Sequence, residues 1–409
     1  MSEGRVLSIQ SHVVHGYVGN KCSVFTLQLL GFDVDPINSV QFSNHTGYTT
    51  FKGTVLQGSE LMTLVQGLEA NDLLDGYTHM LTGYIGSPSF LRAVIDVHRR
   101  LSDANPGLVY ICDPVLGDEG RLYVPAENVD IYRNEVLPLA TMITPNQFEA
   151  ELLSGQTIAT EEDAIRACRI LHSRRELSIG PDTVVITSSR IDGLGGEGDP
   201  NDIVLFASVR RRCCHREVEV AAAEAAVEPF PATSEAPSHG IRSHQAGIGG
   251  SEGPRGGERM GGGNGVRPSR ACQREGAGEG NEADVGDRTA AGTSGGGVGS
   301  PEGGGAEKDG AWAEEIAGDV FDLYRIRFPR LPQRFTGTGD LAAALLLAWT
   351  HKLPGDLAGA LERVAGSMKA VLTRTHSQGS SGELLLVQSK EDIEHPPLDL
   401  RVVALASER

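Results

Sequence analysis

The sequence contains no Cys-x-x-Cys pair, no apolar run long enough to span a bilayer and no stripe of basic residues. Its six cysteines lack the spacing of a disulfide framework, which favours a reduced, intracellular setting. Acidic residues outnumber basic ones by 54 to 36, and the net charge of −18 disfavours general binding to nucleic acid. The N-terminus has no charged and apolar leader, so we expect a cytosolic protein that binds neither membranes nor nucleic acids.

Aromatic residues are almost absent from residues 210–319, a stretch built mainly from Gly, Ala, Glu, Arg, Ser and Pro. Such a composition cannot bury enough apolar surface to offset the conformational entropy lost on ordering. We therefore predict a disordered insertion at residues 210–319, and one domain formed by residues 1–209 and 320–409. The alternatives for the insertion are filler without a function, a retained intron, or an RNA-binding arm, which its many acidic residues disfavour.

Elsewhere, short apolar runs alternate with amphipathic stretches of helical length. Several runs are apolar throughout, which is typical of parallel strands covered on both faces. The pattern predicts an α/β fold with a mostly parallel central sheet and helices on both faces. The runs expected to be strands are residues 6–9, 34–40, 80–82, 108–112, 141–144, 183–187, 203–206, 324–327 and 384–387. The expected helices are residues 21–30, 60–70, 88–102, 147–153, 161–173, 341–349 and 357–372.

The most informative motif is Thr-Gly-Thr-Gly-Asp at residues 336–340, followed at once by an apolar run. Two glycines one residue apart let a turn present backbone N–H groups to an anion, and the following helix adds its positive N-terminal end. Asp340 stands where a base could take a proton from a hydroxyl group while residues 337–339 hold a phosphoryl group. The motif predicts phosphoryl transfer. The competing interpretation is an ordinary turn with an acidic N-cap.

Further polar stretches follow predicted strands, at the edge where open α/β sheets bind ligands. Ser11 lies in the first stretch, and its alternative role is a distant helix cap. Residues 41–48 gather hydroxyl, amide, imidazole and aromatic side chains, which an apolar core would not hold. Asp113 and Asp118 follow a third strand, where carboxylates suit a cation that carries phosphate oxygens. An Asp-Pro turn with a surface acid is the alternative there.

The last stretch opens a helix with Asn146 and Glu149. Asn146 can bind a phosphate oxygen or cap the helix. Glu149 can reach water bound to Mg²⁺ or complete the capping interaction. A cap and a phosphate site are therefore both open from the sequence.

In this order the stretches resemble the pyridoxal kinase family of the ribokinase-like kinases. The resemblance covers residues 5–212 and 323–396 and omits the insertion. It implies a ribokinase-like fold, transfer of the γ-phosphoryl group of ATP to the 5′-hydroxymethyl group of pyridoxal, pyridoxine or pyridoxamine, and a homodimer. The segments that carry it are residues 5–13, 42–48, 81–84, 112–118, 143–153, 182–189 and 337–340.

The resemblance also implies a role for each matching residue. Asp340 matches the general base of the family. The residues expected to contact the vitamer are Ser11, Thr46, Tyr84 and Asp340. Those expected to contact ATP are Asp118, Tyr123, Asn146, Glu149, Thr187, Ser188, Leu331, Pro332, Gln333, Thr336, Gly337, Thr338 and Gly339. Asp118 and Glu149 are expected to hold Mg²⁺ or another divalent cation with ATP, and Asp113 and Thr144 a monovalent cation, K⁺ or Na⁺.

Two features depart from the family pattern. Only residues 119–122 separate Asp118 from Tyr123, where the family has a longer acidic loop that helps to cover the nucleotide, so the placement of Tyr123 is open. The insertion falls between two strand-like runs that the family joins directly. Closure entropy grows only logarithmically with loop length, so the fold can accommodate it. We expect the root of the insertion near the nucleotide side of the site, where it could modulate access.

Other functions remain open from the sequence. A related kinase could act on hydroxymethylpyrimidine or a sugar, but the pyrimidine branch generally has Cys at the position of Asp340, and the stretches at Ser11 and residues 43–48 argue against sugar kinases. A vitamer-binding or scaffold protein without activity is the other class. The presence of Asp340, Asp118 and Glu149 argues against lost catalysis.

Overall fold

The computed structural model describes residues 3–173, 180–191, 202–211, 320–379 and 382–405. The predicted disorder of residues 212–319 therefore falls outside the described residues. The strands are β1 (Arg5–Val13), β2 (Asp33–Phe42), β3 (Gly53–Val55), β4 (His79–Thr82), β5 (Val109–Cys112), β6 (Gly117–Asp118), β7 (Arg121–Leu122), β8 (Met142–Ile143), β9 (Thr183–Ser189), β10 (Ile203–Arg211), β11 (Val320–Phe328) and β12 (Val403–Leu405).

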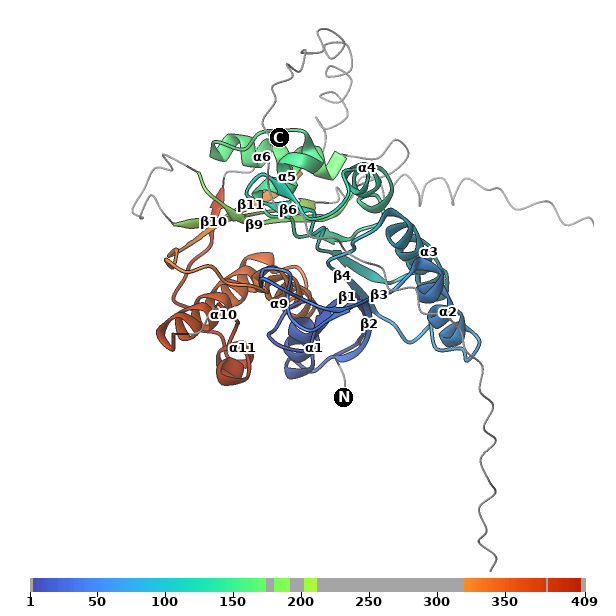
Figure 1. Cartoon of the computed structure of the whole chain (residues 1–409). Helices are drawn as coiled ribbons and strands as arrows, with labels where there is room; N and C mark the ends of the chain where they lie inside the picture. The colour runs from blue at the N-terminus through green and yellow to red at the C-terminus, as the bar shows by residue number, and fades with distance from the viewer. Residues whose placement is uncertain (1–2, 174–179, 192–201, 212–319, 380–381, 406–409) are drawn as a thin grey trace, which may run out of the picture. The chain divides into compact units, whose positions relative to one another are not determined.

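The described residues form a 10-stranded sheet in the order β12-β11-β10-β9-β8-β5-β4-β1-β2-β3 (Figure 1). Neighbouring strands from β2 to β9 in this order run parallel. The strands at the two edges, β3 on one side and β10 to β12 on the other, are antiparallel additions. The predicted mostly parallel α/β sheet is confirmed.

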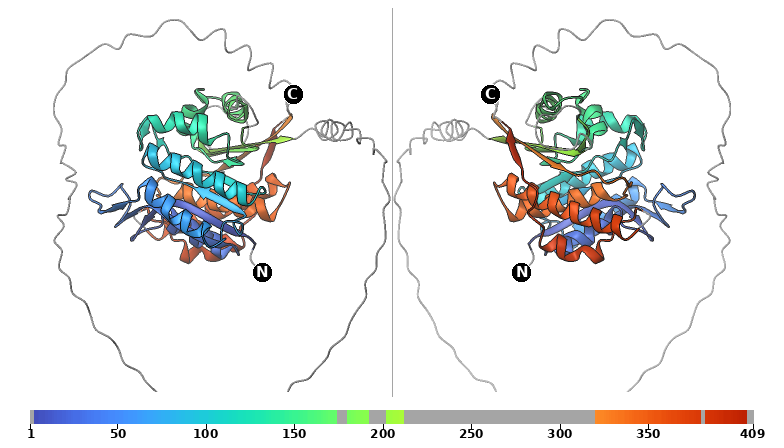
Figure 2. Two further views of the ribbon diagram at one scale, coloured as in Figure 1. Left: turned by 90° about the vertical axis from the view of Figure 1, so that its right-hand side faces the viewer. Right: turned by 90° about the vertical axis from the view of Figure 1, so that its left-hand side faces the viewer.

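Helices cover both faces of this sheet (Figure 2). One core cluster contains buried residues of α2 (Gly58–Glu69), α3 (Pro88–Ala104), α4 (Glu127–Ile131), α5 (Gln147–Ser154) and α6 (Glu161–Ser173). The other contains those of α1 (Asn20–Leu29), α9 (Thr338–Lys352), α10 (Leu357–Ser377) and α11 (Lys390–Glu394). No helix in the described residues has the length and hydrophobicity that crossing a membrane requires.

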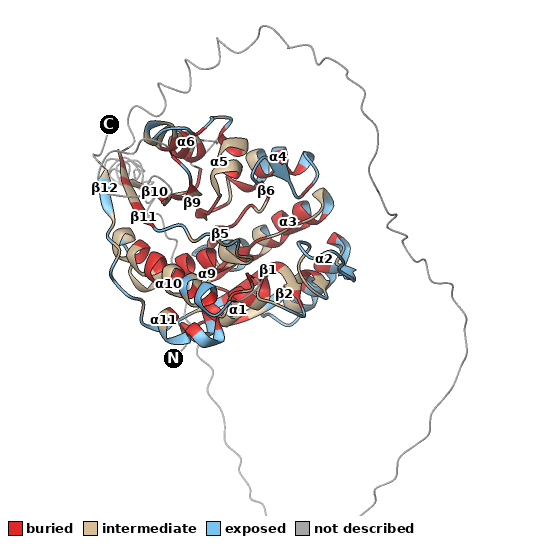
Figure 3. Cartoon of the chain, turned by 60° about the vertical axis from the view of Figure 1, so that its left-hand side comes forward, coloured by how far each residue is buried: buried red, intermediate tan, exposed pale blue. Residues whose placement is uncertain are grey.

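Adjacent residues of the central strands point into opposite cores. In β1, Val6 packs with the α1 and α9 side and Leu7 with the α2 and α3 side, and both are fully buried. In β4, Leu81 likewise packs on the α1 and α9 side and Met80 on the α2 and α3 side. Because side chains alternate along a strand, burial of both faces favours apolar residues at successive positions, and a buried polar residue such as Ser8 is hydrogen-bonded. Figure 3 shows buried residues along these strands and on the helix faces that cover them.

The predicted strand at residues 384–387 is wrong. Leu384 and Leu386 are buried in the core beside α9 and α10, but they lie in a loop followed by a 3-10 helix at Val387–Ser389. Only Glu383, at the start of this segment, forms an isolated bridge, with Thr336. The run is apolar because its side chains fill the core, and a short apolar run of this kind has no periodicity that distinguishes a loop from a strand.

The insertion follows β10 and precedes β11, which pair as an antiparallel hairpin from Ile203 and Phe328 to Arg211 and Val320. Strand β10 therefore extends two residues beyond the predicted boundary at residue 209. The expectation that the insertion begins near the nucleotide side is also wrong. Since β10 runs antiparallel to β9, Arg211 lies at the edge of the sheet where the parallel strands begin, opposite to their ligand-binding ends.

Candidate active site

Helix α9 begins immediately after Gly337, whose φ of 89° lies in the left-handed region that favours glycine. A Cβ atom on Gly337 would lie 2.1 Å from the carbonyl oxygen of Tyr17, so the loop after β1 passes too close for another residue. None of the described side chains caps α9 at this end. Its first-turn N–H groups are thus available to an anion. The interpretation of Asp340 as an N-cap is wrong, because Asp340 occupies the third position of the helix.

The backbone N–H of Gly19 faces the Asp340 carboxylate and lowers its pKa. Burial raises the pKa of Asp340 above its ordinary value, and the Gly19 N–H opposes this shift only in part. Two α1 side chains hold the backbone around it: Ser23 Oγ donates to the Asp340 carbonyl at 3.3 Å and Cys22 Sγ to the Gly337 carbonyl at 3.7 Å. Asp340 is therefore an oriented carboxylate of raised basicity.

Ser11 lies beside this contact, because a Cβ atom on Gly19 would be 2.5 Å from the Ser11 hydroxyl oxygen. Helix α1 starts after Gly19 without a side-chain cap, so the capping alternative for Ser11 is wrong. Tyr84 follows β4, and the Ser39 hydroxyl donates a hydrogen bond to its carbonyl at 2.9 Å. Burial raises the pKa of the Tyr84 phenol.

Thr46 lies in an exposed turn after β2, in which the Tyr48 N–H donates to the His45 carbonyl at 3.3 Å. The side chains of His45 and Tyr48 both contact one carboxylate oxygen of Glu383. Glu383 was not predicted as a site residue. The residues that follow it, Leu384 to Val387, are apolar, and nothing in that run signals a contact with a loop after β2.

Asp113 is only 5% exposed and sits at the start of α9, since a Cβ atom on Gly339 would lie 3.3 Å from its Oδ2. Burial raises the pKa of Asp113 well above its ordinary value, and the negative charges of Glu149 and Asp340 raise it further. The Thr144 hydroxyl acts in the opposite direction by lowering this pKa. Asp113, Glu149 and Asp340 therefore form one electrostatic group.

Glu149 forms the predicted capping interaction with Asn146. Asn146 Oδ1 accepts from the Glu149 N–H, and Glu149 Oε2 accepts from the Asn146 N–H, each at 2.9 Å. Glu149 Oε1 also accepts from the N–H groups of Leu116 at 2.8 Å and Gly117 at 3.3 Å. Burial raises the pKa of Glu149 to about 7, although these hydrogen bonds lower it. Asn146 Nδ2 donates to the Gly117 carbonyl at 2.8 Å, which fixes β6 to the start of α5.

Strands β6 and β7 explain the short connection between Asp118 and Tyr123. They pair as a tight hairpin whose turn residues, Glu119 and Gly120, have φ values of 46° and 78°. Two successive positive φ angles define the type I′ turn that suits a two-residue hairpin loop. The Tyr123 N–H donates to the Leu116 carbonyl at 2.8 Å, and Tyr123 as a residue is 57% exposed.

The hairpin turn contacts two other loops of the site. The Glu119 carboxylate pairs with Arg190, which follows β9, at 3.4 Å and also with Arg334, which precedes Thr336. Asp118 and Glu149 raise the pKa of Tyr123, after the larger effect of burial, so their charges lie near its ring. The short loop therefore still lies close to Glu149 and to the loops that follow β9 and precede Thr336.

Comparison with known proteins identifies the family. The family model described as Phosphomethylpyrimidine kinase matches residues 75–217. The pyridoxal kinase of Arabidopsis thaliana is 41% identical over 97% of this chain and 94% of its own length. The human pyridoxal kinase is 36% identical over 98% of this chain and 99% of its own length. This chain belongs to the pyridoxal kinase family.

Solved structures of the pyridoxal kinase family support the same assignment. The pyridoxal kinase from Leishmania donovani in complex with ADP and pyridoxamine has a TM-score of 0.66 and 28% identity over 98% of this chain and 99% of that chain. The complex of that enzyme with ADP and pyridoxine gives a TM-score of 0.67 at 28% identity over 99% and 100% of the two chains. The predicted family and the ribokinase-like fold are confirmed.

The remaining residues that the pyridoxal kinase resemblance assigns to ATP lie in two places. Thr187 and Ser188 are at the end of β9, where the Thr187 N–H donates to the Pro145 carbonyl at 2.9 Å, next to Asn146. Leu331, Pro332 and Gln333 follow β11, and the Gln333 side chain lies 2.9 Å from Nδ1 of His376 on α10. Their roles toward the nucleotide stay predictions.

The described residues contain no group of three or more His, Cys, Asp and Glu side chains arranged to hold a metal ion by themselves. The contacts of Gly19 and Gly339, together with the charges that act on Asp113, show that Ser11, Asp113, Glu149 and Asp340 lie in one region.

Proposed function

We propose that this chain transfers the γ-phosphoryl group of ATP to the 5′-hydroxymethyl group of pyridoxal, pyridoxine or pyridoxamine and forms the 5′-phosphate. Near full-length similarity to pyridoxal kinases supports this function. The solved relatives bind ADP together with pyridoxamine or pyridoxine. The single observation that carries the proposal is the placement of Asp340, a carboxylate of raised pKa that Gly19 orients at the uncapped N-terminus of α9.

The residues present suit the chemistry. Phosphoryl transfer needs little covalent help from the protein, so positioning and electrostatic stabilisation supply most of the rate. Asp340 takes the proton of the attacking hydroxyl group, and its raised pKa increases its strength as a base. The N–H groups of residues 337–339 stabilise the charge that develops on the transferring group. Ser11, Thr46 and Tyr84 orient the vitamer.

A divalent cation, which we infer to be Mg²⁺, would enter with ATP beside Asp118 and Glu149. The two carboxylates differ in the number of oxygen lone pairs that remain free to bind a cation. Both lone pairs of Glu149 Oε1 accept backbone N–H groups, and Oε2 has one lone pair left. Asp118 is exposed and accepts one N–H, from Glu119 at 2.8 Å. Asp118 would thus be the residue that can bind the cation directly, and Glu149 could contribute only through its one remaining lone pair.

We infer a site for a monovalent cation, K⁺ or Na⁺, at Asp113 and Thr144. Both residues are buried, and the hydroxyl group of Thr144 lowers the pKa of Asp113. The negative charges of Glu149 and Asp340 raise the cost of ionising Asp113, and a cation would offset that repulsion. The oxygen atoms of the pair are of the kind that alkali cations prefer.

We also infer a homodimer and a cytosolic location. Val14, Phe51 and Val55 are 64%, 45% and 52% exposed. The Val14 N–H donates to the Phe42 carbonyl, and the ring centroids of Phe42 and Phe51 lie 5.1 Å apart. These residues therefore form an apolar surface at the β3 edge of the sheet. A second copy would cover it. The described cysteines, Cys22, Cys112 and Cys168, are free thiols, which suits the cytosol.

The test is to incubate the purified protein with Mg-ATP and pyridoxal and to follow pyridoxal 5′-phosphate. Hydroxymethylpyrimidine serves as the competing acceptor, because the sequence leaves a kinase that acts on it as the alternative. The Asp340→Asn variant is expected to lose about 10²–10⁴-fold in kcat, with the KM for ATP within about threefold, since a general base acts in the transition state. If the parent protein forms no pyridoxal 5′-phosphate, the proposed function is contradicted. If Asp340→Asn and the parent protein have equal rates, the assignment of Asp340 as the base is contradicted.

A further inference from the structure

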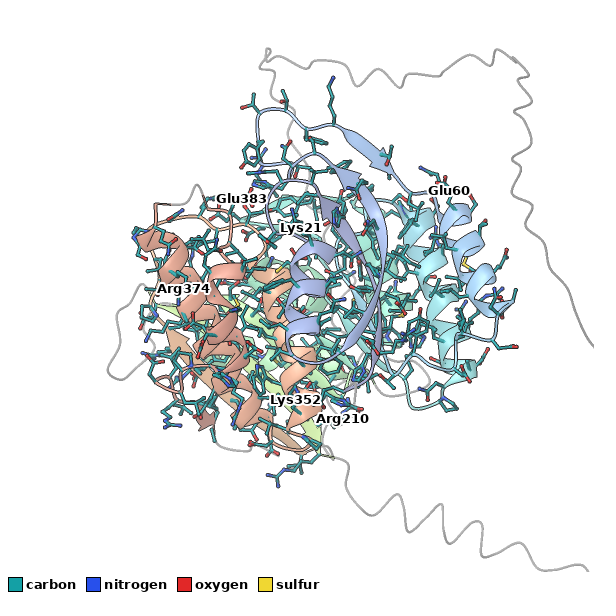
Figure 4. The ribbon with its side chains drawn as sticks, turned by 90° about the horizontal axis from the view of Figure 1, so that it is seen from below. Lys21, Glu60, Arg210, Lys352, Arg374 and Glu383 are labelled. Atoms are coloured by element: carbon teal, nitrogen blue, oxygen red, sulfur yellow. The ribbon has the colours of Figure 1, made fainter. Side chains whose placement is uncertain are left out.

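Glu383 holds both ends of the turn that carries Thr46. Its Oε1 lies 3.2 Å from His45 Nε2 and 3.1 Å from the Tyr48 hydroxyl group, which donates to it. The carboxylate side chain is only 13% exposed. A carboxylate so far from water is stabilised by its hydrogen-bond donors, so these two contacts define where the turn lies. Figure 4 labels Glu383 in the segment between α10 and α11.

The turn is closed on itself as well. The Tyr48 N–H donates to the His45 carbonyl, which makes Thr46 and Gly47 the two central residues of a β-turn. The Gly47 N–H donates to His45 Nδ1 at 3.1 Å. Nδ1 is therefore the acceptor, and in the neutral ring the proton resides on Nε2, which faces Glu383. Thr46 thus projects from a turn whose first and last residues contact one carboxylate oxygen.

The same residue is joined to the segment that precedes the anion site. The Thr336 N–H donates to the carbonyl oxygen of Gly382 at 3.1 Å, and Thr336 and Glu383 form a bridge. On the other side, a Cβ atom on Gly16 would lie 2.1 Å from Glu383 Oε2, so the loop after β1 packs directly against the carboxylate. Three segments of the site therefore meet at Glu383.

We propose that Glu383 is a positioning residue for the vitamer. It fixes the turn that carries Thr46 relative to Thr336 and the first turn of α9, and so sets the distance between the vitamer and the transferring phosphoryl group. The inference rests on the proposed function. Since Glu383 acts through the vitamer side of the site, its loss should affect the vitamer and spare ATP.

The test compares Glu383→Ala with Glu383→Gln. We expect Glu383→Ala to raise the KM for pyridoxal about tenfold while the KM for ATP stays within about twofold, because misplaced binding groups weaken productive binding. Glu383→Gln keeps a carbonyl oxygen that accepts from Nε2 and from Tyr48. It should return the KM for pyridoxal to within about threefold of the parent value. Glu391→Ala, in an exposed position of α11, is the matched control and should change neither constant.

A merely structural role predicts another pattern. If Glu383→Ala raises both KM values equally, or leaves the KM for pyridoxal unchanged, the inference is overturned. Should that variant fail to fold, Tyr48→Phe and His45→Asn remove the same donors singly, since the shorter Asn side chain cannot reach Glu383, and each should give the same selective rise in the KM for pyridoxal. Calorimetric binding of pyridoxal without ATP separates the two proposals, because it reports on Glu383 even if the parent transfers no phosphoryl group.

Discussion

The backbone N–H of Gly19, in the loop after β1, faces the Asp340 carboxylate in the first turn of α9 and lowers its pKa. Gly19 has a φ of 54°, and a Cβ atom there would lie 2.0 Å from the carbonyl oxygen of Ser11. No other residue can occupy this position without moving the backbone, since atoms at that distance overlap. Because Gly19 packs directly against Ser11, the position of the N–H that faces Asp340 depends on the position of Ser11, a residue expected to contact the vitamer.

We expect Gly19→Ala to lower kcat on the order of tenfold or more, because the displaced loop no longer orients Asp340. Steady-state kinetics with pyridoxal measure the effect. Gly67→Ala is the control: Gly67 lies inside α2 with no atom within 4 Å of an added Cβ. That change should leave kcat unaltered and stabilise the protein by roughly 0.5–1 kcal/mol. Parental kcat in Gly19→Ala would show that the contact is dispensable.

The raised pKa of Asp340 should be visible in the pH dependence of kcat. The base works only when ionised, so the rate falls as the pH drops through its pKa. Burial raises this pKa from the ordinary 3.8, which moves the acidic limb of the profile to higher pH. Measurement of kcat across the acidic range with saturating substrates checks this. An acidic limb at an unshifted aspartate pKa, or the same limb in Asp340→Asn, would contradict the assignment.

The same shift has a consequence for stability. The native state binds the Asp340 proton more tightly than the unfolded state, so the carboxyl group costs stability as the pH rises through its pKa. Asp340→Asn removes the buried charge and keeps an oxygen that can accept from Gly19. We expect a higher unfolding midpoint for Asp340→Asn than for the parent at neutral pH, with the difference vanishing toward low pH. Thermal unfolding at two pH values measures it, and a destabilised variant at neutral pH would contradict it.

The sequence predicts the fold well where burial is complete. Runs such as residues 6–9 are mainly apolar because adjacent residues such as Val6 and Leu7 face different cores, and the lengths of the runs distinguish strands from helices. The prediction fails at Leu384 and Leu386, which are as buried as any strand residue but are not paired with a neighbouring strand. Hydrophobicity reports burial, and it does not report whether the backbone pairs.

The site is predictable only in part. Asp340 and Asp113 stand out because carboxylates at the ends of strands and at glycine turns have no role in an apolar core. Gly19 and Glu383 do not stand out, since each acts by meeting a residue far away in the chain. For Asn146 the capping role that the sequence left open is the one formed, and a bond to phosphate would have to use the same side chain.

The β6–β7 turn offers a test of local strain. Glu119 has a φ of 46°, which costs a residue with a Cβ atom about 1–2 kcal/mol. Glu119→Gly and Glu119→Ala both remove the contacts with Arg190 and Arg334, but only glycine removes the strain. We expect the glycine variant to be roughly 0.5–1 kcal/mol more stable than the alanine variant, after allowance for the greater entropy of glycine when unfolded. Urea unfolding measures the difference, and equal stability would exclude strain at this turn.

The pairing of β10 with β11 makes the insertion removable. Arg211 and Val320 are opposite each other in the hairpin, so an Asn-Gly turn can replace residues 212–319 without changing the register. The joined end lies at the edge where the parallel strands begin, away from Asp340. We therefore expect kcat and both KM values of the shortened protein to stay within about twofold of the parent, and folding to be slightly favoured because a shorter loop loses less entropy on closure. Steady-state kinetics and urea unfolding of the two proteins decide the matter. A large change in the KM for ATP alone would assign the insertion a role in nucleotide access despite its distant root.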